Sequence, residues 1–168
     1  MTSTQAVTRF SDPLVQTLAD FVRSIGIQVY AADLPVLASF PGLDIEYGAV
    51  LIDESRLIHP GNILHEAGHI AVTDPRVRNE RKLSPTGGEE LSALAWSYAA
   101  TVYLGFEPEL VFYPGSYQGW DVPLLEGFAE GRYVGIPLLQ RHGMSYDANR
   151  APAMGLQPFP HMVKWLRP

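Results

Sequence analysis

Two histidines and a glutamate near the middle of the chain have the spacing of a metal site. The segment His65-Glu66-Ala67-Gly68-His69 is an H-E-x-x-H motif. Residues four apart project from the same face of a helix, so both imidazoles could reach one ion. Glu66 lies about 100° further round such a helix, where its carboxylate could contact a water held by that ion. The spacing therefore predicts a metal site that activates water, with Glu66 as the general base.

The composition leaves histidine as the only nitrogen ligand for a transition metal. The 168 residues include five histidines and no cysteine. The lack of cysteine excludes disulfide frameworks, cysteine-rich zinc modules and thiol nucleophiles. A catalytic zinc needs a third protein ligand and an open coordination position. We therefore expect one Zn²⁺ ion, held by His65, His69 and a carboxylate.

The third ligand is sought among the carboxylates that follow the motif. Glu89 and Glu90 open the next predicted helix, and the connector before them lets that helix fold back beside the first. On a helix, Glu90 shares a face with Ala93 and Leu94 that would dock against the motif helix, whereas Glu89 points more toward solvent. Glu90 is therefore the preferred ligand. Two further carboxylates, four apart on a later predicted helix, are alternatives: Glu126 and Glu130.

A hydrolase also needs a hydrogen-bond donor for the oxyanion that forms on the substrate. The sequence offers six candidates and does not rank them: Tyr98, Tyr103, Tyr113, Tyr117, Arg132 and His142. The aromatic segment 112–120 is rich in glycine and proline. It could form a rim over the cleft or a loop pinned by its own rings.

Helical hydrophobic periodicity supplies the elements that would carry these residues. The first helix is predicted after the capping residue Asp12, and Gly26 closes it. Three further helices are predicted over 62–73, 89–104 and from 123 to 141 or 142, and Pro137 is expected to kink the last of them or end it early. In the last of these, three glycines four apart would let another backbone approach closely: Gly127, Gly131 and Gly135.

Strand-like runs and loops complete the expected fold. The runs are 27–31, 45–47 and 49–52, and the last two suggest a hairpin or a bulged strand around Gly48. A basic segment is expected to be a solvated loop: Arg76, Arg78, Arg81 and Lys82. We expect an α+β fold in one domain spanning 1–168. In this minimal zincin-like domain a small antiparallel sheet or hairpin packs on the motif helix, and an irregular tail occupies about 144–168.

Charge and hydropathy limit the expected partners. Twelve Lys and Arg against eighteen Asp and Glu give a net charge of −6, which argues against a nucleic-acid binder. The sequence shows neither a signal peptide nor a stretch of about 18 apolar residues, so we expect a cytoplasmic protein without a membrane partner. With 46% hydrophobic and 18% charged residues, a partner surface or a homo-oligomer is compatible with the composition.

Over roughly residues 45–105 the chain resembles a minimal gluzincin metallopeptidase, in particular the IrrE/ImmA-type zinc peptidases. The resemblance rests on the hairpin, the motif helix and a second helix that begins Glu90-Leu-Ser-Ala-Leu-Ala-Trp. It implies that His65, His69 and Glu90 bind zinc and that Glu66 is the general base. Larger gluzincins carry a supporting aspartate four residues after the ligand glutamate, and this chain has Leu94 there.

The sequence therefore predicts a zinc-dependent metallopeptidase or amide hydrolase that acts on a peptide or protein. The alternative is a metal-stabilised regulatory or protein-binding module without turnover. Three protein ligands and an open position would favour the enzyme, whereas four protein ligands would favour the structural role.

Overall fold

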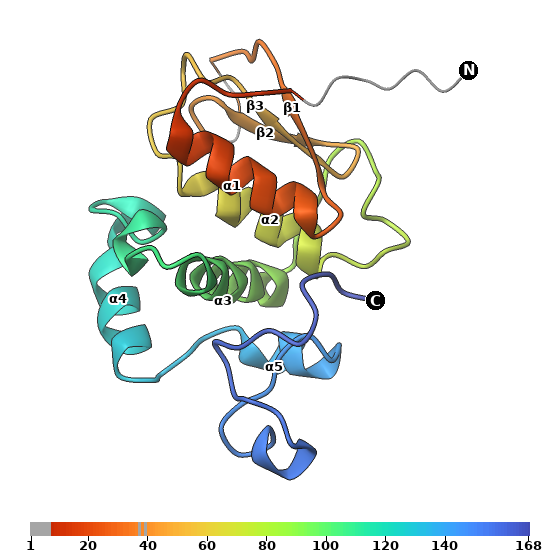
Figure 1. Ribbon diagram of the computed structural model, residues 1–168, viewed down its shortest axis with the longest axis vertical. Helices are drawn as coiled ribbons and strands as arrows, with labels where there is room; N and C mark the ends of the chain where they lie inside the picture. Colours follow the sequence, from red (N-terminus) through yellow and green to blue (C-terminus); the bar gives the residue numbers. More distant parts are fainter. Residues whose placement is uncertain (1–7, 37, 39) are drawn as a thin grey trace.

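The structure, a computed structural model, describes residues 8–36, 38 and 40–168. Figure 1 shows the helices α1 and α2 against one face of a small sheet, with α3 beyond α2. The helices and strands follow in this order: α1 (Pro13–Ser24), β1 (Gln28–Ala31), β2 (Leu43–Glu46), β3 (Ala49–Ile52), α2 (Asn62–Val72), α3 (Gly87–Tyr103), α4 (Asp121–Ala129) and α5 (Ile136–Arg141). Three short 3-10 turns lie at Pro108–Leu110, Ser116–Gly119 and Pro152–Met154.

The sheet is mixed, with the strand order β1-β3-β2. β2 and β3 form the predicted hairpin and are antiparallel, and its turn residues Tyr47 and Gly48 both have positive φ. β1 pairs with β3 in parallel, so the expectation of a purely antiparallel sheet is wrong. A parallel pair needs a long connection, and residues 32–48 provide it. Hydrophobic alternation marks a strand but does not encode the direction of its neighbour.

Helix α2 is buried along its whole length, and it lies between the α1–sheet layer and α3 (Figure 1). A helix buried on every side is typical of the centre of a domain. Its contact with α3 depends on Gly68, because a Cβ there would lie 3.0 Å from the carbonyl oxygen of Ala93 and 3.3 Å from the ring of Trp96. The small residue inside the motif thus lets the two helices that carry the predicted ligands approach closely.

Side-chain caps mark the starts of α1 and α3, and α3 begins at Gly87, two residues before the predicted start at Glu89. The Asp12 side chain accepts hydrogen bonds from the backbone N–H groups of Leu14 and Val15. Helix α3 begins with a capping box in which Thr86 and Glu89 bond to each other's backbone N–H. These side chains satisfy N–H groups that have no partner inside the helix.

The single late helix predicted from residue 123 is wrong, because the structure has two. α4 ends at Ala129, and both Gly131 and Gly135 have positive φ, a conformation that breaks an α-helix. The predicted close approach is nevertheless present at one of these glycines. A Cβ on Gly135 would lie 2.0 Å from the carbonyl oxygen of Leu91 in α3.

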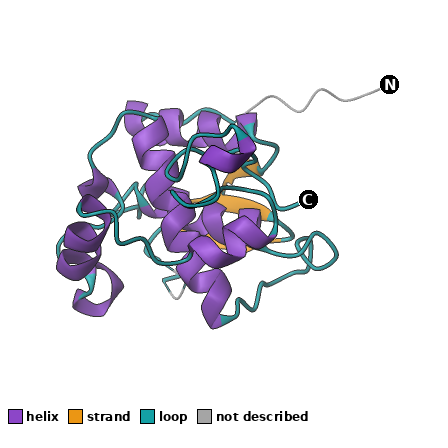
Figure 2. Ribbon diagram, turned by 90° about the horizontal axis from the view of Figure 1, so that it is seen from below, coloured by secondary structure: helices purple, strands orange, loops and turns teal. Residues whose placement is uncertain are grey.

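The tail from 144 to 168 is irregular, as expected, yet it packs tightly. Trp96 of α3 donates its indole N–H to the carbonyl of Trp165 at 2.9 Å, and Phe159 and Met162 are buried. Figure 2, seen from below, shows loop segments lying across the helices, with the small sheet behind them. Within the described residues, no helix is both long and apolar enough to cross a bilayer.

Candidate metal centre

Three potential metal ligands from two helices converge on one point. The Nε2 atoms of His65 and His69, one turn apart on α2, lie 3.0 Å apart, and the Nε2 of His69 lies 3.4 Å from Oε2 of Glu90 on α3. Ligands about 2.0–2.2 Å from a tetrahedral zinc are separated by about 3.3 Å. One ligand atom from each residue lies within 4.8 Å of the others. His65, His69 and Glu90 could therefore hold a metal ion.

The group lies in a cleft of about 570 Å³. The two histidines are buried at its base, whereas the side chain of Glu90 is 50% exposed. The cleft is lined by β2, α2, the loop that precedes α3 and the aromatic segment: Phe40, Asp44, Ile45, His65, Glu66, His69, Lys82, Leu83, Pro85, Glu90, Tyr113, Gly115, Ser116, Tyr117 and Gln118. A concave site with a few convergent polar groups is typical of ligand-binding sites.

Burial keeps both imidazoles in the form that binds metal. Desolvation, followed by the charge of His69, lowers the pKa of His65 to about 3. Desolvation also lowers the pKa of His69, although Glu90 and Glu89 act in the opposite direction. Neutral imidazole is the state that coordinates a metal, so the histidines need not lose a proton at neutral pH to bind one.

Glu66 lies in the same cleft with 4% of its surface exposed. Burial raises the pKa of its carboxyl to about 8, and the negative charges of Asp44 and Glu90 add to that effect. A carboxyl group whose pKa is near neutral can both accept and donate a proton during a reaction. In the metal-free chain this pKa keeps the carboxyl mostly protonated at neutral pH, and a cation bound beside it would favour the carboxylate form that a general base needs.

All four buried side-chain atoms that lack a hydrogen-bond partner in the described chain belong to residues lining this cleft. They are Nδ1 of His65, Nδ1 of His69, Oγ of Ser116 and Oη of Tyr117. Buried polar atoms in native proteins are nearly always paired, so this concentration fits a site that a ligand completes. The two Nδ1 atoms also lack the acceptor that usually orients a metal-bound imidazole.

The two hydroxyl groups are presented by an unusual turn. Tyr117 and Gln118 adopt left-handed φ values of 52° and 57°, which cost non-glycine residues free energy and are concentrated at functional sites. The Tyr117 ring lies 5.3 Å from that of His65. Burial, followed by the charges of neighbouring groups including Glu66, raises the pKa of its hydroxyl, so Tyr117 remains a proton donor.

The alternative carboxylates have other contacts. Glu89 bonds to Thr86 in the capping box and lies 3.6 Å from the guanidinium of Arg167. Glu126 and Glu130 are exposed on and just after α4, and Glu130 forms an ion pair with Arg132. None of these three carboxylates joins the group that could hold a metal.

The structure separates the six candidate oxyanion donors. Four do not line the cleft: Tyr98, Tyr103, Arg132 and His142. Tyr113 does, but its hydroxyl accepts a hydrogen bond from Asn62 and its ring stacks on His59 at 3.7 Å. Tyr117 lines the cleft with its hydroxyl unpartnered. The aromatic segment thus combines the two expected forms, because its rings pack together and two of them also border the cleft.

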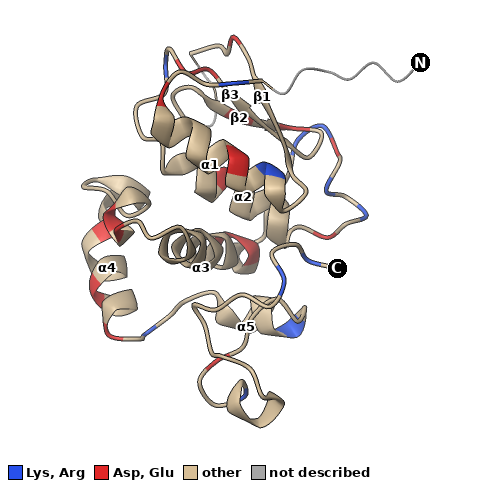
Figure 3. Cartoon of the chain, in the orientation of Figure 1, with Lys and Arg blue, Asp and Glu red and all other residues tan. Residues whose placement is uncertain are grey.

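Sequence reasoning did not single out four polar residues that line the cleft: Asp44, Lys82, Ser116 and Gln118. The expectation that the basic segment is solvated is wrong for Arg78, which is partly buried and donates to the carbonyls of Ile70 and Thr73. Lys82 is exposed as expected, and its ammonium lies 2.7 Å from Asp44. The acidic residues of β2 and the basic residues of this segment have opposite charges, and that was the signal in the sequence that could have predicted their contact. Figure 3 shows the basic loop beside the acidic end of β2.

Comparison with known proteins gives no relative for this chain: no family model, curated protein or solved structure matches it. The interpretation of the cleft therefore rests on its own geometry and chemistry.

Proposed function

We propose that the protein is a zinc-dependent hydrolase of peptide or amide bonds, of the minimal gluzincin type that its motif resembles. The observation that carries the proposal is the convergence of His65, His69 and Glu90 beside the buried carboxyl of Glu66. Two neutral imidazoles and one carboxylate suit zinc and are typical of catalytic sites. Because the group has three members, a fourth coordination position stays open.

The residues of the cleft have complementary roles in this reaction. Zinc, when bound at such a site, lowers the pKa of a water ligand to about 7 and polarises a carbonyl group. Glu66 accepts the proton of the attacking water and passes it to the departing amine. Tyr117 donates its hydroxyl proton in a hydrogen bond to the carbonyl oxygen as negative charge develops there.

Metal analysis combined with two substitutions tests the proposal. The wild-type protein should bind about one zinc per chain, and His65→Ala should lose it. Glu66→Gln should keep the zinc but lose about 10²–10⁴-fold in kcat, measured with fluorescent casein and a pool of quenched peptides. His161→Ala, a change of an exposed histidine outside the cleft, is the matched control and should keep both properties.

The same experiment distinguishes the alternative of a metal-stabilised binding module. In that case zinc would bind, but the wild-type protein and Glu66→Gln would be equally inactive on every substrate tested. If the wild-type protein binds no zinc and His65→Ala changes neither metal content nor Tm, the metal site itself is refuted.

A further inference from the structure

A second cavity lies on the opposite side of α3 from α2 and the candidate metal centre. Its volume is about 710 Å³, and it is bordered by the loop before α5, by α5 itself, by residues 147–150 and by Phe159. Figure 1 shows α5 and the tail below α3, whereas α2 and the sheet lie above it. No described residue lines both this cavity and the metal-centre cleft. The cavity is therefore a separate site, to which the proposed function assigns no role.

The inner wall of the cavity is apolar and aromatic. Ile136 and Phe159 are buried, and the rings of Tyr133 and Phe159 meet edge to face with their centroids 4.6 Å apart. The cavity shares Tyr133, Pro137 and Arg141 with an adjoining cavity of about 420 Å³. A wall of this kind holds the apolar body of a small ligand away from water.

The polar wall of the cavity is held in place by the chain's own hydrogen bonds. The N–H of Asp147 donates to Oε1 of Gln140 at 3.0 Å. Oδ1 of Asp147 accepts the N–H groups of Asn149 and Arg150 at 3.0 and 2.8 Å, and these bonds, that of Arg150 first, lower the pKa of the carboxyl. Because residues 147–150 are already fixed against α5, a ligand would have little chain to order on binding.

Two arginines of the cavity have unpaired guanidinium groups. Arg141, the last residue of α5, and Arg150 are exposed and line the cavity, yet neither guanidinium forms a hydrogen bond or ion pair within the described residues. Every other arginine of the described chain except Arg9 has such a partner: Arg23, Arg56, Arg76, Arg78, Arg81, Arg132 and Arg167. Positive charge without an internal partner is thus concentrated at this cavity.

We propose that this cavity is a second ligand site, and that it binds a small organic anion: a carboxylate or phosphate ester that carries an apolar ring. Guanidinium groups bind carboxylate and phosphate oxygens through paired N–H donors. Two of them stand here beside one carboxylate, Asp147, in a chain whose net charge is −6. The ring of the ligand would pack on Tyr133 and Phe159. The inference does not depend on the proposed function, because neither Glu66 nor a candidate metal ligand lines the cavity.

Titration of the isotope-labelled protein with phenyl phosphate, followed through its amide chemical shifts, tests the proposal. Because the probe has few atoms, saturable binding is expected in the millimolar range, with shifts concentrated at residues 131–141 and 147–150. The same titration in His65→Ala should give the same Kd, which excludes binding to a metal ion. Phenylacetate is the second probe, and tighter binding of either compound supports the proposal and identifies the anionic group.

Substitution of the arginines tests the recognition of charge. Arg141→Gln and Arg150→Gln should each weaken the binding of phenyl phosphate about 3–10-fold. Both should change Tm little, because neither guanidinium has a partner in the fold. Arg9→Gln is the matched control, since it removes an exposed, unpaired guanidinium that does not line the cavity, and it should leave Kd unchanged.

Two further compounds test whether the site needs both charge and ring. Inorganic phosphate lacks the ring and benzyl alcohol lacks the charge, so each should bind more weakly than phenyl phosphate. Several results would overturn the inference: no saturable binding, equal binding of either of these compounds, equal weakening by Arg9→Gln, loss of binding in His65→Ala, or shifts confined to the metal-centre cleft.

Discussion

Glu66 keeps a carboxyl group almost entirely out of water, beside Asp44 and Glu90, and this has a measurable consequence for stability. Its pKa is about 8 in the folded, metal-free chain, against an ordinary value of 4.5. Folding therefore favours the protonated form. Below about pH 4.5 Glu66 is protonated in both states and does not lower the free energy of unfolding. Between about pH 4.5 and 8 it ionises in the unfolded chain but not in the folded one, so the free energy of unfolding falls as pH rises. Above about pH 8 it is ionised in both states and the loss stays constant.

We expect Glu66→Gln to stabilise the metal-free protein increasingly as pH rises. Gln cannot ionise, so the advantage should be small at pH 4.5 and on the order of a few kcal/mol at pH 8. Urea unfolding in the presence of a chelator measures the difference. Glu126→Gln, on the exposed face of α4, is the control and should show no such trend. An equal difference at the two pH values would contradict the interpretation.

Tyr117 provides a second prediction at this scale. Tyr117→Phe should retain zinc and lose about 10–10³-fold in kcat, because it removes one donor to the developing negative charge. Its Tm should not fall, since the hydroxyl has no partner in the metal-free fold. In the control Tyr113→Phe, loss of the Asn62 hydrogen bond should affect Tm more than kcat. Unchanged kcat in Tyr117→Phe would remove this tyrosine from the mechanism.

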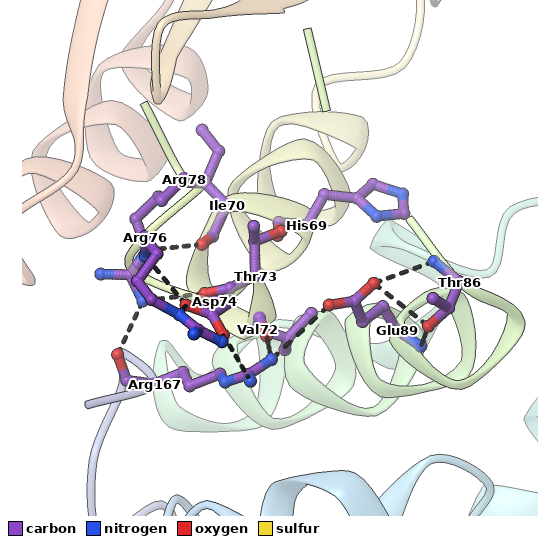
Figure 4. Close-up of polar contacts among 10 residues, drawn as sticks. All are labelled: His69, Ile70, Val72, Thr73, Asp74, Arg76, Arg78, Thr86, Glu89 and Arg167. Atoms are coloured by element: carbon purple, nitrogen blue, oxygen red, sulfur yellow. Dashed lines mark hydrogen bonds and ion pairs between the residues drawn. The ribbon is translucent and has the colours of Figure 1, made fainter. Parts of the chain in front are cut away.

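At the scale of elements, Arg167 ties the end of α2 to the beginning of α3 (Figure 4). Its guanidinium contacts the carbonyl of Val72 at 3.3 Å, Asp74 at 3.3 Å and Glu89 at 3.6 Å. Its backbone N–H donates to the carbonyl of Ala71. The tail thus holds together the two helices that carry the candidate ligands.

Arg167→Met should therefore destabilise the protein by about 1–3 kcal/mol, the range for partly buried hydrogen bonds of a charged group. It should also weaken zinc binding several-fold, because α3 is held less firmly against α2. Arg76→Met is the control, because Arg76 pairs with the same Asp74 but is 87% exposed. Thermal denaturation and zinc titration measure both effects, and equal losses in the two variants would refute a specific role for Arg167.

At the scale of the whole molecule, the apolar core extends through α1, the sheet, α2, α3 and the tail. Because this core is built from apolar side chains, we expect the metal-free protein to remain folded.

Zinc should nevertheless raise the Tm by mass action. At a free concentration of 100 times Kd, binding to the folded state adds about 2.7 kcal/mol. For a domain of this size that corresponds to a Tm increase of about 5–10 °C. Scanning calorimetry with and without chelator should show this shift, and it should disappear in His65→Ala. A shift that persists in that variant would place the stabilising ion elsewhere.

The sequence by itself determined the features that depend on neighbours along the chain. The motif helix, the Asp12 cap, the β2–β3 hairpin and the start of α3 all follow from local spacing, since a helix or a turn is specified within a few residues. The same spacing puts the two motif histidines on one face of α2, before any tertiary contact is considered.

Only the tertiary structure decided which side chains from distant segments meet. The close approach at Gly68 brings Glu90 into the group that could hold a metal ion, while Arg167 and Thr86 bind Glu89. The left-handed turn at Tyr117 and the contact of Lys82 with β2 could not be read from periodicity, nor could the parallel pairing of β1. Each of these features depends on how segments far apart in the sequence pack against one another. That packing is determined by the burial of apolar side chains and the hydrogen bonds of the whole chain.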